Sequence, residues 1–324
     1  MSWKELLRNN FTKWEPLCDF LQLDDSLRAQ VLKQSAFPLN LPLRLAEKIA
    51  KNRLDDPILR QFVPLAEEGA PPPVELVGYS ADPLQEASFC KSSKFLHKYH
   101  GRALLVSTSA CAMHCRFCFR RHFPYDIATK GFEEELNLIA NDPTLQEIIV
   151  SGGDPLSLSN DALGSLLNSL ENIPHVKRVR FHTRFPIGFP ERLEPALLGL
   201  LDRRRFQIWL VIHCNHAIEL DDEVLASLKA VQKLGIPVLN QGVLLKGVND
   251  DVSTLEELYS KLVDHGILPY YLFVLDRVEG AHHFDVPEEI GIALIEQLRA
   301  RMSGYGVPKL VREIPGKLSK TSLV

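Results

Sequence analysis

No stretch of this sequence approaches the ~20 consecutive apolar residues that cross a bilayer. The first ten residues, MSWKELLRNN, are charged where a secretory signal needs an apolar core, so we expect a cytoplasmic protein. An excess of basic charge is also absent, because 37 Lys and Arg residues stand against 41 Asp and Glu residues. Since phosphate contacts need concentrated Lys and Arg, this balance argues against a nucleic-acid-binding protein and favours a small substrate.

Cysteine is scarce, with six residues in a chain of 324. Six unevenly spaced cysteines in so long a chain do not indicate a disulfide framework. Cys111, Cys115 and Cys118 lie close together, which suggests metal ligation by reduced thiols. The other three are scattered along the chain: Cys18, Cys90 and Cys214.

Internal repeats and low-complexity segments are absent as well, and 45% hydrophobic and 24% charged residues are ordinary values for a globular protein. Residues 1–95 are predicted to form short helices interrupted by prolines, for example over 25–33 and 43–52, before a Pro-rich stretch at 70–73. We interpret residues 1–95 as an N-terminal helical cap and connector. Residues 96–324 are predicted to form a second, larger domain.

From about residue 100, short apolar runs alternate with amphipathic stretches. The predicted strands are 103–107, 147–151, 179–182, 208–213, 238–244 and 270–275. The predicted helices are 133–140, 161–170, 222–234, 253–265 and 286–302. This alternation predicts an α/β fold, either an open parallel sheet or a partial (β/α) barrel of about six parallel strands. Polar motifs follow the strand ends, where α/β folds bind their ligands.

The three clustered cysteines follow the first predicted strand in the segment C-A-M-H-C-R-F-C. Three thiolates at this Cys-x3-Cys-x2-Cys spacing can wrap one loop around a single iron–sulfur cluster, and the flanking Met and Phe side chains would limit access of water. The alternative is a structural zinc site with His114 or His122 as the fourth ligand. Zinc sites usually have two Cys-x2-Cys arms, and no second arm exists in this sequence.

The cysteine spacing resembles that of the radical S-adenosylmethionine (radical SAM) superfamily, in which three cysteines hold three irons and the fourth iron binds S-adenosylmethionine. From residue 80 onward the chain resembles the lysine 2,3-aminomutase family, most closely its short bacterial branch, the EpmB-type enzymes of the elongation factor P modification pathway. The matching blocks are LHKYHGR (96–102), CFRRHFPY (118–125), SGGDPL (151–156), NQGVLLKGVND (240–250) and SGY (303–305). The resemblance implies a partial barrel of radical SAM type and makes 96–324 the catalytic domain.

The resemblance implies a [4Fe-4S] cluster on the three clustered cysteines and S-adenosylmethionine as its partner. Gly152, Gly153 and Asp154 would meet the amino group of S-adenosylmethionine, and His213 and Gln241 would also contact that molecule. Two adjacent glycines let backbone approach a ligand closely. For the Gly-Gly-Asp turn taken alone, an ordinary strand-to-helix connection is the competing interpretation.

Pyridoxal 5'-phosphate is the third implied cofactor, with its resting Schiff base on Lys320. Lys98 and Arg102 would contact its phosphate, and Tyr99 its ring. The family has a glycine run before the lysine, whereas this chain has one glycine there and offers Lys317 as a competing amine. A solvated basic tail is the alternative.

The implied substrate is lysine, with Arg120 binding its carboxylate and Asp276 and Glu313 its ε-ammonium. Glu313 stands where the family has an aspartate, and a surface ion pair is the alternative for each residue alone. The implied reaction converts L-α-lysine to β-lysine through a 5'-deoxyadenosyl radical and a pyridoxal imine. It needs an external electron donor and has an implied functional link to elongation factor P and its ligase.

Two other functions remain open from the residues. The first is a radical enzyme that acts on another amino acid or on a macromolecule. The second is a zinc-stabilised interaction module without catalysis.

Overall fold

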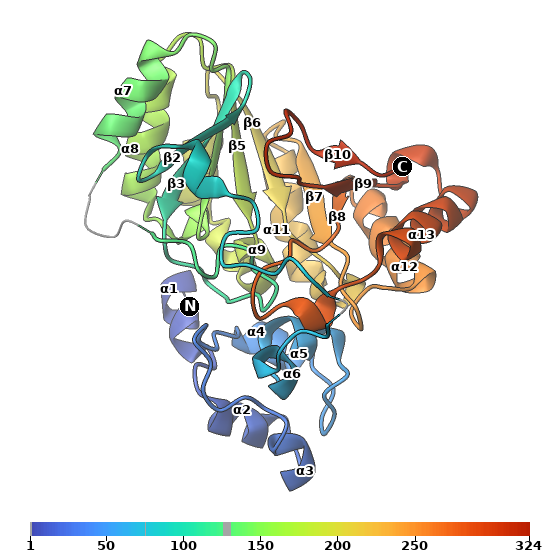
Figure 1. Cartoon of the computed structure of the whole chain (residues 1–324). Coiled ribbons are helices and arrows are strands. Elements are labelled where there is room, and N and C mark those ends of the chain that lie inside the picture. The colour runs from blue at the N-terminus through green and yellow to red at the C-terminus, as the bar shows by residue number, and fades with distance from the viewer. Residues whose placement is uncertain (1, 75, 126–130) are drawn as a thin grey trace.

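The computed structural model describes residues 2–74, 76–125 and 131–324 (Figure 1). Six short α-helices precede the sheet: α1 (Trp3–Leu6), α2 (Trp14–Phe20), α3 (Asp25–Arg28), α4 (Leu43–Glu47), α5 (Pro57–Phe62) and α6 (Ala66–Gly69). Local chemistry sets where they begin. At α5, for example, the Asp56 carboxylate accepts hydrogen bonds from the backbone N–H groups of Ile58 (2.8 Å) and Leu59 (3.1 Å), and Pro57 occupies the first turn.

The N-terminal helices lie at one end of the sheet (Figure 1). Their buried side chains, among them Leu45 and Phe62, belong to the same contiguous apolar cluster as Leu105 and Val179 of the sheet. The sheet begins at Cys90, inside the segment that we predicted as a cap and connector, and the domain division at residue 95 stays a prediction. The N-terminal helices therefore share their core with the part of the chain that carries the predicted site.

A single ten-stranded sheet follows, in which the strands lie in chain order. The strands are β1 (Cys90–Ser92), β2 (Phe95–Tyr99), β3 (Arg102–Thr108), β4 (Glu147–Gly152), β5 (Arg178–Thr183), β6 (Gln207–Ile212), β7 (Val238–Val243), β8 (Leu268–Phe273), β9 (Lys309–Arg312) and β10 (Thr321–Ser322). Neighbours from β3 to β9 are parallel, whereas β1, β2 and β10 pair antiparallel at the two ends. All six predicted strands are confirmed. The four missed strands are short and mostly polar, or pair at the sheet ends.

Helices connect the parallel strands on the outside of the sheet (Figure 1). The α-helices are α7 (Glu133–Asn141), α8 (Asn160–Glu171), α9 (Phe185–Gly188), α10 (Pro195–Leu201), α11 (Asp222–Gln232), α12 (Val252–Asp264) and α13 (Glu288–Arg301). The longer helices bury apolar residues that recur at helical spacing, as Leu163, Leu166, Leu167 and Leu170 do in α8. None of the helices in the described ranges is both long and apolar enough to span a membrane.

The sheet curls around a cavity that is lined by residues of β2, β3, β4, β5, β7 and β8, and by His213 directly after β6. A flat sheet could not bring side chains of its second and eighth strands to one cavity, so these strands share a concave face. Among the described residues no strand pairing joins β1 to β10. The fold is therefore a partial (β/α) barrel, one of the two architectures that the alternation of strands and helices predicted and the one that the family resemblance implied.

Candidate active site

The barrel interior holds a cavity of about 430 Å³. Predicted site residues from all parts of the chain line it: Lys98, Tyr99, Arg102, Arg120, His213, Gln241, Asp276, Glu313 and Lys320. These residues follow or occupy different strands, so the curled sheet is what brings them together. Cavities of this size accept small molecules.

Glu313 is the centre of one end of the cavity. Its Oε1 atom accepts hydrogen bonds from Lys98 Nζ (2.9 Å) and Tyr99 OH (2.8 Å), and its Oε2 atom accepts one from Lys320 Nζ (2.5 Å). Burial alone would raise the pKa of Glu313, but the charges of Lys320 and Lys98 outweigh burial and hold this pKa at about 2. A predicted substrate residue and three predicted pyridoxal phosphate residues thus form one ion-paired group.

The short β10 strand explains how Lys320 reaches this group. Thr321 pairs with Arg312 in the antiparallel β9–β10 ladder. Lys320 precedes Thr321 and Glu313 follows Arg312, so these two residues also face each other. Lys320 is half-buried and its Nζ atom lies 4.9 Å from the ring centroid of Phe273. Lys317, the competing amine, is exposed. Of the two lysines, only Lys320 lines the cavity.

This end of the cavity has the donor set that a pyridoxal phosphate would need. Lys98, Arg102 and Lys320 supply positive charge for a phosphate, and the Arg102 guanidinium lies 4.6 Å from the ring centroid of Tyr99. Lys320 supplies the primary amine. These residues fit the cofactor that the sequence implied.

Asp276 lies in the same cavity, three residues after β8. Burial raises its pKa to about 7, and the negative charge of Glu313 adds to that rise. No basic side chain of the described ranges forms an ion pair with its carboxylate. Asp276 is therefore a half-buried carboxyl that a cationic ligand would stabilise in its ionised form.

Arg120 holds an internal carboxylate, which the sequence did not indicate. Its Nε and Nη2 atoms donate to the two oxygens of Glu86, at 2.8 and 2.6 Å, and its Nη1 atom donates to Ser151 Oγ at 3.4 Å. The guanidinium is thus oriented for bidentate binding of a carboxylate at the cavity wall. No spacing motif in the sequence singles out Glu86, which contacts Arg120 only through the fold.

Two imidazole rings in the cavity wall have unsatisfied nitrogens. The Nε2 atoms of His213 and His182 are buried and have no hydrogen-bond partner within the described ranges. Their rings pack edge to face at 5.6 Å, and burial lowers both pKa values, that of His213 to about 3. Buried polar atoms without partners are uncommon, so these two nitrogens are candidates for ligand contact. Sequence reasoning missed His182, although its place at the end of a predicted strand could have suggested it.

The Gly-Gly-Asp turn is fastened to the start of the cysteine loop. Gly153 N–H donates to Thr108 O at 2.7 Å, and Asp154 N–H donates to Ala110 O at 2.8 Å. A Cβ atom on Gly153 would lie 2.4 Å from Ala110 O, so only glycine fits this close backbone approach. The turn therefore positions the cysteine loop, besides any contact with a ligand.

The Asp154 carboxylate is fully engaged inside the protein. It accepts hydrogen bonds from the backbone N–H groups of Leu156 (3.0 Å), Arg184 (2.8 Å) and Phe185 (3.0 Å), and from the hydroxyl of Thr183 (2.7 Å). These contacts tie the end of β4 to the end of β5. A contact between this carboxylate and S-adenosylmethionine stays a prediction. The backbone groups of Gly152 and Gly153 make fewer hydrogen bonds than the carboxylate and are therefore more available to a ligand.

The three clustered thiols lie near one another on one loop. Burial raises the pKa of Cys111 and of Cys118, the latter to about 11, and the charge of Cys115 raises both further. The Cys115 Sγ atom accepts a hydrogen bond from Arg184 Nη1 at 2.9 Å. Within the described ranges, no three His, Cys, Asp or Glu side chains already converge at metal-ligand distances.

The donor chemistry of this loop fits an iron–sulfur cluster better than zinc. Three thiols are present, and the other cysteines are elsewhere: Cys18 and Cys214 are buried and Cys90 is exposed. His114, one candidate fourth zinc ligand, instead contacts Pro38 O through Nδ1 at 2.9 Å and stacks on Phe37. Three soft thiolates, without a converging fourth ligand among the described residues, suit a cluster that keeps one iron open.

Comparison with known proteins gives the chain its relatives. The L-lysine 2,3-aminomutase of Escherichia coli (strain K12) is 41% identical over 99% of this chain and 94% of the relative. The L-lysine 2,3-aminomutase of Haemophilus influenzae is 39% identical over 99% of this chain and 95% of the relative. That of Clostridium subterminale is 33% identical over 99% of this chain and 77% of the relative.

No protein-family model matches the chain. A crystal structure of a radical SAM methyltransferase from Sphaerobacter thermophilus covers 67% of this chain and 68% of that chain, with a TM-score of 0.49 and 21% identity. The sequence relatives extend much further. With 33% to 41% identity along nearly its whole length, the chain belongs to the L-lysine 2,3-aminomutase family.

Proposed function

We propose that this protein converts L-α-lysine to β-lysine with a [4Fe-4S] cluster, S-adenosylmethionine and pyridoxal phosphate. The observation that carries the proposal is the content of the barrel cavity. A bidentate arginine, Arg120, two carboxyls, Asp276 and Glu313, and the amine of Lys320 share it. This set offers a partner for each charged group of lysine and an attachment point for the cofactor.

In this proposal Arg120 binds the substrate carboxylate, because its Nε and Nη2 atoms already bind the Glu86 carboxylate through two hydrogen bonds. Asp276 binds the ε-ammonium, since it is a half-buried carboxyl without an ion-pair partner in the described part of the chain. Glu313 adds a second negative charge and balances Lys98 and Lys320. Phe273 contributes an apolar part of the cavity wall beside Lys320.

Cys111, Cys115 and Cys118 would hold the cluster, and His213, Gln241 and the two glycines of the Gly-Gly-Asp turn are the proposed contacts of S-adenosylmethionine. Lys320 would hold pyridoxal phosphate, with Lys98, Tyr99 and Arg102 around it. When bound, the cluster supplies the electron that cleaves S-adenosylmethionine, and pyridoxal phosphate supplies the conjugated system through which nitrogen moves between adjacent carbons.

The proposal is tested with full-length protein that is reconstituted anaerobically with iron, sulfide and pyridoxal phosphate. Lysine, S-adenosylmethionine and dithionite are added, and β-lysine is measured by mass spectrometry, with glutamate as the comparison substrate. We expect β-lysine and no β-glutamate. If protein that carries the cluster and pyridoxal phosphate makes no β-lysine, the proposal is refuted. If it converts glutamate and not lysine, glutamate is the substrate instead.

The proposed use of the product is attachment to elongation factor P. The sequence blocks shared with the short bacterial branch support this use. Cells that lack the gene should contain elongation factor P without the mass of a β-lysyl group, and β-lysine in the medium should restore it. Unchanged elongation factor P in those cells would remove this part of the proposal.

A further inference from the structure

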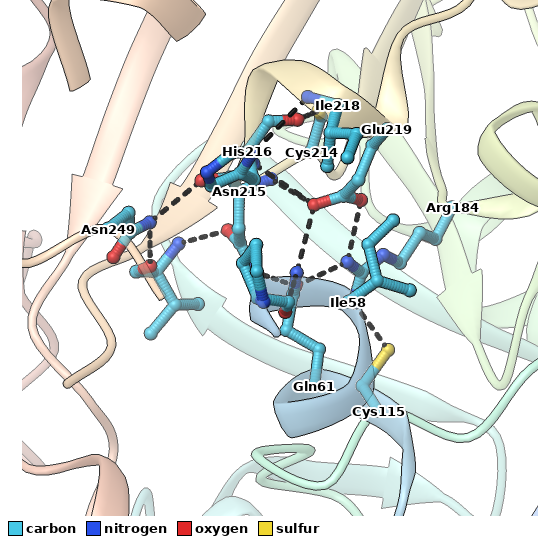
Figure 2. Close-up of polar contacts among 12 residues, drawn as sticks. Ile58, Gln61, Cys115, Arg184, Cys214, Asn215, His216, Ile218, Glu219 and Asn249 are labelled. Carbon is cyan, nitrogen blue, oxygen red and sulfur yellow. Dashed lines mark hydrogen bonds and ion pairs between the residues drawn. The ribbon is translucent and has the colours of Figure 1, made fainter. Parts of the chain in front are cut away.

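Arg184 is a buried cation beside the cysteine loop that the proposed reaction does not use. It follows β5 and is 5% exposed. Its Nη1 atom donates to Cys115 Sγ at 2.9 Å (Figure 2). Its guanidinium lies 4.6 Å from the ring centroid of Phe62 and 5.4 Å from that of Phe117. The charge is therefore held in an apolar surrounding next to one cluster thiol.

Glu219 and Gln61 hold the other side of the guanidinium. Arg184 Nη2 donates to Glu219 Oε2 at 2.8 Å and to Gln61 Oε1 at 2.6 Å (Figure 2). Glu219 is fully buried, and its Oε1 atom accepts hydrogen bonds from the backbone of Asn215 and His216, each at 3.0 Å. The position of Arg184 is thus determined from three elements, α5, β5 and the turn after β6.

Gln61 belongs to the N-terminal helices, whose role the sequence left without explanation. The backbone carbonyl of Gln61 accepts a hydrogen bond from the backbone N–H of Arg116, inside the cysteine loop, at 2.8 Å. Two more N-terminal side chains reach that loop: Asn10 Nδ2 donates to Ala112 O at 2.8 Å, and Asn40 Nδ2 donates to Cys111 O at 3.3 Å. The N-terminal helices therefore form the wall behind the cysteine loop.

We propose that Arg184 is a positioning residue that fixes the Cys115 thiolate and raises the reduction potential of the cluster, with Gln61 and Glu219 holding it in place. The inference rests on the proposed function, because it requires the cluster. Reduction adds one electron from an external low-potential donor and transfers no atoms. A cation and an N–H···S hydrogen bond stabilise the added negative charge, and more so in a buried site of low dielectric constant.

The test measures the midpoint potential of the cluster by redox titration, followed by electron paramagnetic resonance, in the full chain without lysine. R184Q removes the cation. We expect about a tenfold lower ratio of reduced to oxidised cluster at a given potential, which is about 59 mV for one electron. R184K keeps the charge but loses the planar guanidinium that reaches Cys115 and Glu219 through separate nitrogens, so its potential should lie between those of the wild type and R184Q. Q61A should give a smaller shift in the same direction.

Arg192 provides the matched control, because it is equally buried but bonds to Leu156 O and Asn160 Oδ1 instead of a thiol. R192Q should leave the potential unchanged. The inference is wrong if R184Q keeps the wild-type potential with full iron content, or if R192Q shifts the potential equally. If R184Q binds no iron, R184K serves as the test instead, and a wild-type potential in R184K would overturn the inference.

The two proposals fail in different ways. Wild-type protein that assembles no iron–sulfur cluster contradicts the proposed function. Wild-type protein that assembles a cluster and makes β-lysine, while R184Q and R184K keep its potential, contradicts only the role of Arg184.

Discussion

The two ends of the candidate site are built in contrasting ways. At the cysteine end, backbone hydrogen bonds and buried side chains from the N-terminal helices hold the loop, and Arg184 is fixed by partners on both sides. At the Lys320 end, opposite charges touch directly, and the segment that carries them runs through an exposed turn in which Leu318 is 90% exposed. The first arrangement is preorganised, whereas the second must exchange partners when a ligand binds.

Glu313 and Asp276, both at the Lys320 end of the site, also differ in whether their carboxyls already have partners among the described residues. Glu313 is ionised because two lysines surround it, and Asp276 keeps its proton to about pH 7 because burial dominates. A ligand with an ammonium group therefore gains more from Asp276, because none of the described residues forms an ion pair with it. The following changes test the two ends, from the largest expected effect to the smallest.

Lys320→Ala removes the proposed attachment point of pyridoxal phosphate, so we expect complete loss of β-lysine formation. Absorption spectra before and after borohydride treatment measure the bound cofactor, and wild-type protein should retain it covalently. Lys317→Ala is the matched control, since this lysine is exposed three positions away, and it should keep cofactor and turnover. The reverse pattern would assign the amine to Lys317.

Glu68→Gln tests how firmly the cysteine end is built. The buried Glu68 carboxylate binds Arg116 Nε at 2.7 Å and Arg121 Nη2 at 2.5 Å. Removing its charge leaves two buried cations unpaired, so the free energy of unfolding should fall by about 3 kcal/mol. Denaturant unfolding measures this loss. Glu67→Gln is the control, because Glu67 is exposed and should change stability by less than about 1 kcal/mol.

Acid should weaken the same contact. Burial raises the pKa of Glu68. Arg116 and Arg121 lower this pKa by more than burial raises it, so it lies below the ordinary value of 4.5. The stabilisation is therefore complete above that value and is lost as the pH falls through the lowered pKa. Stability curves of the wild type and Glu68→Gln should converge in acid, and parallel curves would contradict this account.

Asp276→Asn tests the ammonium site. The wild-type kcat/KM for lysine should rise with pH through about 7, because Asp276 ionises there and then attracts the substrate cation. The substitution should lower kcat/KM roughly 10- to 100-fold and remove this rise. Asp285→Asn is the control, since Asp285 lies outside the cavity beside Arg277. An unchanged pH profile in Asp276→Asn would rule out the assignment.

The raised pKa of Asp276 also has a consequence for folding. The native protein holds this proton between the ordinary pKa of 3.8 and about 7, where the unfolded chain has released it. The contribution of Asp276 to stability therefore declines as the pH rises through that window. Asp276→Asn should flatten this part of the stability curve.

Glu86→Gln should have the smallest effect. Its carboxylate holds Arg120 in the cavity, so a neutral amide would compete less with the carboxylate of lysine. We expect the KM for lysine to fall about threefold. A higher KM would show instead that Glu86 orients Arg120. Lys91→Gln, an exposed change on the neighbouring strand β1, should leave KM unaltered.

Much of this arrangement was predictable from local patterns. Alternating apolar runs marked β3 to β8, because a buried parallel strand needs several consecutive apolar residues. The cysteine spacing marked the loop that we propose as the cluster site, and the order of short blocks marked the family that the relatives establish. These features depend on neighbouring residues or on short spacings along the chain.

Other features depended on contacts between distant segments. Arg184 and Gln61 are 123 positions apart, and Arg120 and Glu86 are 34 apart, so no local pattern could pair them. The two residues of β10 are too few to predict as a strand, yet their register sets Lys320 against Glu313.

Residue type and spacing therefore determined which chemical groups the protein carries: three thiols, a set of cations and the carboxyls that face them. Folding decided their environment. Burial and neighbouring charge hold the pKa of Glu313 at about 2 and raise that of Asp276 to about 7, although both began as ordinary carboxyls. Because electrostatic energies depend on distance and solvent exposure, only the curled sheet could set the state of each group.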